Sequence, residues 1–564
     1  MPMAEESSDP IRSVESSPQS ASREVLAGLL VGAFALVVFF FYLGTYGLWE
    51  PDEARYAEIA REILVLHDWI VPHLNFVPYI EKPPLLYWLT ALSMQLFGVN
   101  EFAARFVNAA AALIGVLTTY FFALRVYGLR HAIVAASVLT TSALYAVMAQ
   151  VLTTDMLLTS MVTIALFAFF LHWREGGRWC WIAYIAMGLG VLTKGPIAVA
   201  LPTTSVALFV FFRSEMRTAL RGFHVIAGYT LAALVCAPWF IAIAIRQPDF
   251  IHFYFIGEHL QRFFDKSYSH GEPFYYYVPV VLGGLLPWTL LAILLPWRSM
   301  PPDPARRYCL IAFATILVVF SAANAKLVPY ILPAMPPIAI VLADRLLALA
   351  DNSRRLAAAG LMMSLTGGVV VGVASMVHRF ASANPAMVQP ELYAAGTIML
   401  AAGAALFLFF SRNRLDAGLT TVAVSTAIIL IVAGHGRIRM ESLRSYAQLG
   451  RDIASLAPDS RLICYPRYIQ SLPFYTQRRV ILIGPKTELD YGATHAPDAA
   501  AFFYDRRTDL LRLWNSDPAP LLILDRQALP PLEQSLGSYR IVASDNKKLA
   551  ITRSQGNLSK GDSR

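Results

Sequence analysis

Charged side chains are scarce in this sequence: they make up 15% of the 564 residues, whereas hydrophobic residues make up 56%. So low a charge content excludes an ordinary soluble globular protein. Cysteine is also rare, with four residues in all. Cys180, Cys236 and Cys309 lie in or beside apolar segments and Cys464 stands alone near the C-terminus. Neither a disulfide framework nor a CxxC metal site is therefore available.

The N-terminus lacks the features of a cleaved signal. Residues 1–22 are polar and rich in serine and proline, with no cationic segment and no small-residue cleavage site. We therefore expect residues 1–24 to be a disordered cytoplasmic tail, and the apolar run that follows to be retained as a membrane span.

Long apolar blocks are what the sequence has in abundance. Each is close to the roughly 20 residues that a helix needs to cross about 30 Å of hydrocarbon. We predict a transmembrane domain over residues 25–435 with about thirteen helices. The predicted spans are 25–47, 106–124, 132–150, 156–172, 179–193, 197–212, 223–245, 274–296, 308–323, 328–343, 356–377, 393–411 and 417–434.

Arginine marks one side of this predicted bundle. If the N-terminus lies inside, every short inside loop carries arginine, whereas the shortest outside turns carry one lysine or none, as the positive-inside rule requires. The inside arginines are Arg125, Arg130, Arg174, Arg178, Arg213, Arg217, Arg221, Arg298, Arg306, Arg307, Arg345, Arg354, Arg355, Arg412 and Arg414. An odd number of spans then places residues 436–564 outside. The net charge of +8 reflects these loops and contact with anionic lipid rather than nucleic acid.

Three of the predicted outer segments are long: 48–105, 246–273 and 436–564. In the first, Glu53 to Leu66 has an amphipathic pattern, which predicts a helix lying in the membrane interface. In the third, short apolar runs alternate with polar or helix-like stretches, which predicts a small soluble α/β domain. Its expected strands are Arg461–Tyr465, Val480–Ile483, Ala500–Tyr504, Pro520–Leu524 and Arg540–Ala543.

The unusual ionisable residues all fall on the predicted outer side. A charge at membrane depth is costly unless it is paired or hydrated, so each is a candidate functional group. They are Asp52, Glu53, Glu81, Lys82, Asp155, Lys194, Glu258, His259, Arg262 and Lys326, with Tyr330 close to the last. Several cations converging on one face would form a phosphate site, with lysines as point charges and Arg262 as a bidentate fork.

Each of these residues also has a purely structural interpretation. Asp52 and Asp155 suit the first turn of a helix, and the Glu81–Lys82 pair suits solvent. Lys194 is typical of lysines that extend their ammonium group to the membrane interface. Two carboxylates at the outer mouths of different spans, in a chain this poor in charge, favour the functional interpretation.

A metal site is a further alternative. Glu258-His259 could ligate a divalent cation with Glu81 as a partner, although a lone histidine is more often not a ligand. The sequence alone leaves open whether these residues bind a metal ion.

Five motifs closely resemble those of the bacterial members of the protein O-mannosyltransferase-like superfamily of C-type glycosyltransferases (GT-C). The motifs are Leu48–Glu58 (LWEPDEARYAE), Tyr79–Trp88 (YIEKPPLLYW), Thr154-Asp155, Thr193–Pro196 (TKGP) and Glu258–Phe263 (EHLQRF). The resemblance covers roughly residues 25–345. It implies the GT-C fold, a polytopic α-helical membrane domain of about thirteen helices, here followed by a soluble α/β domain. Within the superfamily, the motifs are most similar to those of transferases that add 4-amino-4-deoxy-L-arabinose to lipid A.

The resemblance also implies roles for particular residues. The catalytic positions correspond to Asp52, Asp155 and Lys82. The residues expected around the phosphate of the lipid carrier are Tyr56, Tyr79, Lys82, Lys194, Arg262 and Tyr330. The divalent-metal pair corresponds to Glu81 and His259.

The implied reaction takes a sugar from undecaprenyl phosphate and places it on a phosphate of lipid A, at the periplasmic face of the bacterial inner membrane. Cations would neutralise the charge that grows on the leaving phosphate. No nucleotide is required, which agrees with the lack of a glycine-rich nucleotide loop. The expected partners are the carrier-linked sugar, lipid A and the lipids of the inner membrane, with no nucleic acid, and the expected state is a monomer.

Other functions remain open at this point. A related enzyme could use the same carrier chemistry on protein Ser/Thr or on another lipid. A transporter for lipid-linked sugars would instead show paired halves and charges at the membrane midplane, whereas here the charges lie at the outer rim. A structural scaffold for an envelope complex is the third alternative.

Overall fold

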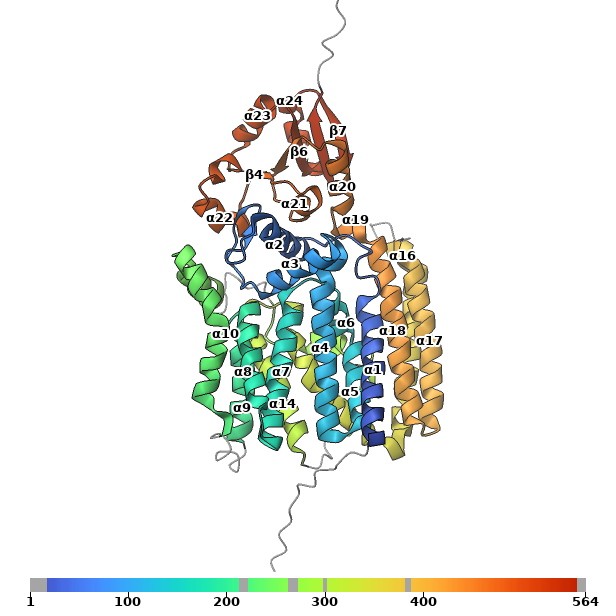
Figure 1. Cartoon of the computed structure of the whole chain (residues 1–564). Helices are drawn as coiled ribbons and strands as arrows, with labels where there is room; N and C mark the ends of the chain where they lie inside the picture. Colours follow the sequence, from blue (N-terminus) through green and yellow to red (C-terminus); the bar gives the residue numbers. More distant parts are fainter. Residues whose placement is uncertain (1–17, 213–221, 262–271, 298–301, 381–386, 555–564) are drawn as a thin grey trace, which may run out of the picture.

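The computed structural model describes residues 18–212, 222–261, 272–297, 302–380 and 387–554. Most of the chain forms an α-helical bundle, and the C-terminal residues form a separate domain that covers one end of it (Figure 1). Between the two lies a thin layer built from the first long outer segment.

All thirteen apolar segments predicted from the sequence are helical over most of their length. The bundle helices are α1 (Pro18–Phe40), α4 (Glu101–Tyr127), α5 (Leu129–Thr141), α6 (Ala143–Ala149), α7 (Thr154–Glu175), α8 (Trp179–Lys194), α9 (Ile197–Phe211), α10 (Val225–Arg246), α12 (Tyr277–Gly284), α13 (Trp288–Ala292), α14 (Pro304–Ala322), η5 (Val328–Ala334), α15 (Met335–Leu347), α16 (Ala357–Phe380), α17 (Gln389–Ser411) and α18 (Leu415–Arg439). Within the described residues, nine helical segments are long and apolar enough to cross a membrane, or ten if α5 and α6, bent by 67°, form one span.

The remaining predicted spans are shorter than a full crossing or are interrupted. The helices α8 and α9 have 16 and 15 residues and stand beside α7 and α10 in the bundle (Figure 1). The predicted span 274–296 consists of two short helices, α12 and α13, separated at Pro287. A proline there removes a backbone N–H and clashes with the preceding turn, so a continuous helix is disfavoured.

The first helix begins earlier than the sequence indicated. α1 starts at Pro18, so the predicted disordered tail is wrong over residues 18–24, while residues 1–17 lie outside the described part of the chain. Proline is well tolerated in the first turn of a helix, where its missing N–H would have no partner. The carbonyl of Glu24, in the second turn, also accepts a hydrogen bond of 2.7 Å from Tyr120 of α4, which anchors the start of α1 to the bundle.

The outer layer consists of α2 (Asp52–Leu66), a short hairpin of β1 (His73–Leu74) and β2 (Val77–Pro78), and α3 (Leu85–Phe97). The predicted helix from 53 to 66 is thus confirmed, and its place in the membrane interface stays a prediction. Its polar residues Glu58, Arg61 and Glu62 are buried, because α2 lies between the bundle and the C-terminal domain (Figure 1). Burial is possible because the Arg61 guanidinium donates to both oxygens of Glu58 at 2.6 and 2.7 Å.

The C-terminal domain is the predicted α/β unit. It begins after α18, which continues to Arg439, four residues past the predicted end of the transmembrane domain at residue 435. Its mixed sheet has the order β5-β4-β3-β6-β8-β7. The strands β5, β4, β3 and β6 pair in parallel, and β8 pairs antiparallel with both β6 and β7. The strands are β3 (Arg461–Tyr465), β4 (Ile481–Ile483), β5 (Phe503–Tyr504), β6 (Pro520–Asp525), β7 (Tyr539–Ser544) and β8 (Lys548–Arg553). Four of the five predicted strands are present at nearly the predicted bounds, the fifth is shortened to Phe503–Tyr504 because a 3₁₀ turn occupies Ala499–Ala501, and β8 was not predicted.

Short helices surround this sheet. The helices are α19 (Glu441–Arg444), α20 (Ala447–Leu456), α21 (Ser471–Thr476), α22 (Asp490–His495), α23 (Arg507–Ser516) and α24 (Glu533–Leu536). Two of them, α21 and α22, reach the outer layer. At the start of α21, the backbone N–H groups of Gln470 and Ser471 donate to Glu50 at 3.1 and 2.8 Å. The side chain of Asn75 pairs with the backbone of Val480 through two bonds of 2.9 Å. These hydrogen bonds therefore fix the C-terminal domain on the loops before and after α2.

Candidate active site

Two of the predicted acids begin helices at the end of the bundle that faces the C-terminal domain. Asp52 is the first residue of α2 and Asp155 the second of α7. Carboxylates in the first turn interact favourably with the helix dipole. The buried Tyr56 interacts electrostatically with both acids and with Glu81. The residues quoted from separate sequence motifs are therefore neighbours in space.

Asp155 forms an ion pair with Lys194, the last residue of α8. The ammonium of Lys194 also lies over the ring of Tyr330, 4.1 Å from its centroid. Three elements far apart in the sequence, α7, α8 and the 3₁₀ helix η5, thus contribute one acid, one cation and one phenol to the same place. A partly desolvated ammonium between an aromatic face and a carboxylate is well placed to accept a phosphate as a new partner.

Asp52 is the more accessible acid, with a side chain 49% exposed. One of its oxygens accepts a hydrogen bond from the guanidinium of Arg55, one helical turn further on. The exposure leaves the carboxylate open to a substrate, while the pairing with Arg55 limits the directions in which it can point.

Glu53, next to Asp52, has a different environment. Its buried carboxylate receives two hydrogen bonds from Arg105, of 2.9 and 2.8 Å, and one of 3.0 Å each from the backbone N–H groups of Trp49 and Leu152. Burial alone would raise the pKa of Glu53, but the charge and hydrogen bonds of Arg105 lower it below its ordinary value. Glu53 is therefore an ionised structural residue that ties the first outer loop to the loop before α7.

Arg55 was not among the candidate residues proposed from the sequence, where it appeared only within the motif Leu48–Glu58. It pairs with Asp52, and its other terminal nitrogen lies 3.6 Å from Glu488 of the C-terminal domain. Burial would lower the pKa of Arg55, but the neighbouring Tyr79 and Tyr56 phenols and Asp52 raise it well above its ordinary value. Its spacing of three residues from Asp52 on a helix was the signal that could have identified it.

The motif around Pro83 lies close to Arg55 and Tyr56, with which its residues Tyr79 and Glu81 interact electrostatically. The Tyr79 hydroxyl donates to Glu81 at 3.0 Å, and the Lys82 ammonium donates to the Glu81 carbonyl at 3.3 Å. Burial, with the charge of Glu81, raises the pKa of Tyr79 well above its ordinary value, so the phenol stays a donor. Burial likewise raises the pKa of Tyr56. Neutral tyrosines and a lysine here suit contact with a phosphate.

Three other candidates have a different outcome. Lys326 is buried and donates to the carbonyl of Ala323 at 2.6 Å, so its cation stabilises the turn before η5. Arg262 lies outside the described residues, and so does the side chain of His259, although the backbone of His259 belongs to the π-helical segment His252–Gln261. Their predicted roles therefore remain predictions.

The described residues contain no group of three or more His, Cys, Asp or Glu side chains that could hold a metal ion. Glu81, the described member of the predicted metal pair, already accepts a hydrogen bond from Tyr79. A divalent cation at this place would therefore need ligands from outside the described part of the chain, such as the His259 side chain, or from water.

Acids and cations form pairs at one end of a polytopic helical bundle, and the α/β domain covers that end. This architecture defines a membrane-embedded glycosyltransferase of the GT-C fold. Residues 81–241 match the family model of dolichyl-phosphate-mannose-protein mannosyltransferase, and residues 449–553 match that of the aminoarabinose transferase C-terminal domain.

Curated relatives and solved structures agree with these family matches. The undecaprenyl phosphate-α-4-amino-4-deoxy-L-arabinose arabinosyl transferase of Erwinia tasmaniensis is 33% identical over 73% of each chain. That of Pectobacterium carotovorum is 30% identical over 89% of this chain and 95% of its own. The crystal structure of ArnT from Cupriavidus metallidurans bound to undecaprenyl phosphate superposes with a TM-score of 0.84 at 27% identity, covering 93% of this chain and 97% of that one. The chain belongs to the family of undecaprenyl phosphate-α-4-amino-4-deoxy-L-arabinose arabinosyl transferases, and it is a multi-pass membrane glycosyltransferase.

Proposed function

We propose that this protein transfers 4-amino-4-deoxy-L-arabinose from undecaprenyl phosphate to a phosphate of lipid A. The observation that carries the proposal is the convergence of two acid–cation pairs, Asp52 with Arg55 and Asp155 with Lys194, at the end of the bundle below the C-terminal domain. The names of the relatives supply the sugar and the carrier.

The donor phosphate is assigned to the side of the site that contains Lys194. A phosphate entering there replaces Asp155 as the partner of the Lys194 ammonium, and the ring of Tyr330 holds that ammonium in place. Lys82, with Tyr56 and Tyr79 near it, supplies a further cation and neutral hydroxyl donors. Arg262 is proposed to add a bidentate contact.

The chemical step is a single displacement at the anomeric carbon. An oxygen of the lipid A phosphate forms the new bond to this carbon, the bond to the carrier phosphate breaks, and the electron pair of that bond goes to the leaving phosphate. Lys194 and Lys82 stabilise the charge that grows there. The acceptor oxygen is already anionic at neutral pH, so no base has to remove a proton. The role assigned to Asp52 is to stabilise positive charge on the sugar ring in the transition state.

We propose that the reaction takes place at the periplasmic face of the inner membrane. The arginines at Arg125, Arg130, Arg412 and Arg414 belong to the end of the bundle opposite to the C-terminal domain, and positive charge favours the cytoplasmic side. Addition of an amino sugar there reduces the negative charge of lipid A, so the expected consequence is resistance to polymyxin and other cationic peptides.

A divalent cation between Glu81 and His259 is a separate proposal. Glutamate and histidine are suitable ligands, and the cation would position the loop that contains Lys82. Measurement of bound metal in the purified protein, in Glu81→Gln and in His259→Ala tests it. Metal that is retained in both variants would contradict this assignment.

The deciding experiment is a transfer assay with the carrier-linked sugar and lipid A. Asp52→Asn should abolish transfer while the protein keeps its normal expression and melting temperature, and the exposed Glu533→Gln is the matched control. Full activity of Asp52→Asn would remove Asp52 from the mechanism. Mass spectrometry of lipid A from a deletion strain tests the substrates: loss of the aminoarabinose adduct supports the proposal, and unchanged lipid A refutes it in favour of another acceptor or a transporter.

A further inference from the structure

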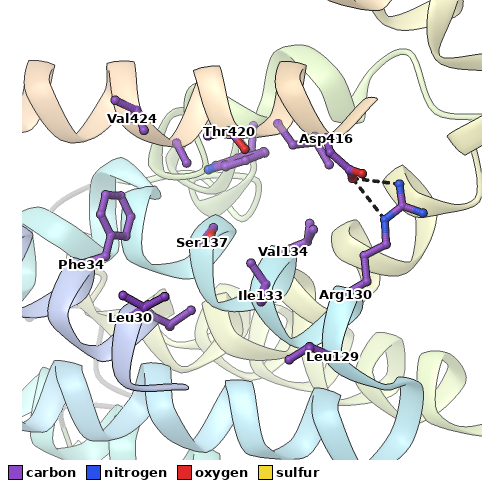
Figure 2. A pocket seen from close by; sticks show the side chains of 14 residues that line it. Leu30, Phe34, Leu129, Arg130, Ile133, Val134, Ser137, Asp416, Thr420 and Val424 are labelled. Atoms are coloured by element: carbon purple, nitrogen blue, oxygen red, sulfur yellow. Dashed lines mark hydrogen bonds and ion pairs between the residues drawn. The ribbon is translucent and has the colours of Figure 1, made fainter. Parts of the chain in front are cut away.

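A cavity of about 630 Å³ lies among α1, α5 and α18, away from the site described above. It is lined by Leu30, Val31, Phe34, Leu129, Arg130, Ile133, Val134, Ser137, Trp288, Asp416, Leu419, Thr420, Ala423 and Val424. Figure 2 shows the charged side chains of Arg130 and Asp416 at one end of the cavity and the apolar Phe34 and Val424 at the other. Its volume is within the range of about 300–1,000 Å³ that is typical of ligand sites.

The position of the cavity is fixed by the helix ends that form its charged mouth. Arg130 is in the first turn of α5 and Asp416 in the first turn of α18, and both turns lie at the end of the bundle opposite to the C-terminal domain (Figure 1). The apolar part of the cavity extends from there along the helices, and lining residues such as Leu30 and Val424 are 63% and 46% exposed. The cavity is therefore open at its side, where hydrocarbon surrounds a membrane protein.

The mouth presents one cation and one anion together. Arg130 donates to Asp416 through Nε at 3.1 Å and Nη2 at 2.8 Å. The side chains are 50% and 70% exposed, so water screens this pair and a competing ligand can separate it. A guanidinium matches the geometry of a phosphate, and a carboxylate matches an ammonium group.

We propose that this cavity binds a zwitterionic phospholipid with an ethanolamine headgroup. One acyl chain occupies the apolar channel, the phosphate contacts Arg130, and the ammonium contacts Asp416. The acyl chain of such a lipid fills the apolar channel, and its phosphate and ammonium pair with the two opposite charges at the mouth. A purely anionic headgroup would instead bring a second negative charge close to Asp416. The site is independent of the proposed transfer reaction, because its charged mouth and the Asp155–Lys194 pair lie at opposite ends of the bundle.

The test uses the full-length protein in bilayers that contain a phosphatidylethanolamine with a photoreactive acyl chain. After irradiation, mass spectrometry identifies the labelled peptides. The expected result is labelling concentrated on the α5 and α18 residues that line the cavity. Thr420→Trp, which fills the channel, should lower this labelling by about fivefold or more. Ser137→Leu is a second, milder filling variant, and Leu365→Trp on the exposed face of α16 is the control.

The headgroup is tested by competition. Arg130→Gln should weaken binding of the labelled lipid by about tenfold, whereas Arg125→Gln should not, because Arg125 is a similarly exposed arginine paired with Glu175 that does not line the cavity. Labelling spread evenly over all lipid-facing helices would overturn the proposal. So would displacement by undecaprenyl phosphate, which would assign the cavity to the carrier, or equal competition by phosphatidylglycerol, which would remove the role of Asp416.

Discussion

Arg55 connects the helix that carries Asp52 with the C-terminal domain: its Nη1 lies 3.6 Å from Oε1 of Glu488, while Nη2 pairs with Asp52. Glu488 is held in turn by the side-chain amide of Gln470. The neighbouring Glu50 accepts backbone hydrogen bonds at the start of α21. The soluble domain thus contributes to the orientation of the acid that we place in the transfer reaction.

The first prediction concerns this connection. Glu488→Gln should lower kcat by about three- to tenfold, since it removes one partly exposed ion pair worth roughly 1 kcal/mol. KM should stay unchanged, because Glu488 positions Arg55 without contacting substrate, and the melting temperature should fall by only about 2–4 °C. The effect should not add to that of Arg55→Lys in a double-mutant cycle. Equal kcat in Glu488→Gln and the control Glu533→Gln would show that the domain does not influence Asp52.

The second prediction separates the two adjacent acids. Glu53→Gln should lower stability by about 3 kcal/mol, because it leaves the buried Arg105 without its anionic partner. Asp52→Asn, the same chemical change one residue away, should leave the melting temperature unchanged and abolish transfer. Thermal melting followed by fluorescence, together with the transfer assay, measures both. Equal melting temperatures for the two variants would contradict the structural role of Glu53.

The third prediction concerns the pair between α7 and α8. Lys194→Met should reduce kcat/KM by about 100-fold, since it removes the cation assigned to the donor phosphate. Lys194→Arg should recover part of the loss, because a guanidinium also binds phosphate. Binding of undecaprenyl phosphate, measured separately, should weaken in parallel. The control is Lys547→Met, on the surface of the C-terminal domain, and normal donor binding by Lys194→Met would reject this role.

The fourth prediction is a pH dependence of stability. Burial, together with the neighbouring Glu58, raises the pKa of Glu62 well above its ordinary value of 4.5. The contribution of the neutral Glu62 carboxyl to the free energy of unfolding is fully present below pH 4.5. It is lost as the pH rises towards the pKa of Glu62 in the folded protein.

Glu62→Gln should remove this dependence. The amide remains neutral and its oxygen can still accept the hydrogen bond of 2.9 Å from the Phe76 N–H. We expect the variant to melt at a higher temperature than the wild type at pH 8 and at a similar temperature near pH 4.5. Parallel melting curves of both proteins across this range would show that Glu62 is ionised in the folded protein.

Much of the architecture could be predicted because the membrane imposes it locally. A helix that crosses hydrocarbon must satisfy its backbone hydrogen bonds within itself and cover its surface with apolar side chains, so length and composition suffice to locate it. The α/β character of the C-terminal domain was predictable for a similar reason, since buried strands are short apolar runs. The strand Lys548–Arg553 was missed because charged residues begin and end it.

The environments of the polar residues could not be predicted in the same way. Asp52 and Glu53 are adjacent acids that follow the same proline, yet one is half exposed and the other is enclosed by Arg105. Arg55 and Arg61 each have an acid three residues earlier on α2, but only the docking of the C-terminal domain brings Glu488 to Arg55. Sequence spacing carries no information on such long-range partners.

By itself, then, the sequence determined that the chain is a bundle of membrane helices with an outer domain and that its unusual charges gather at one end. Only the tertiary structure decided which charges pair and which remain open to substrate. The reason is physical: hydrophobic transfer depends on the residues of one segment, whereas the state of a charge depends on dielectric environment and partners that distant segments bring to it.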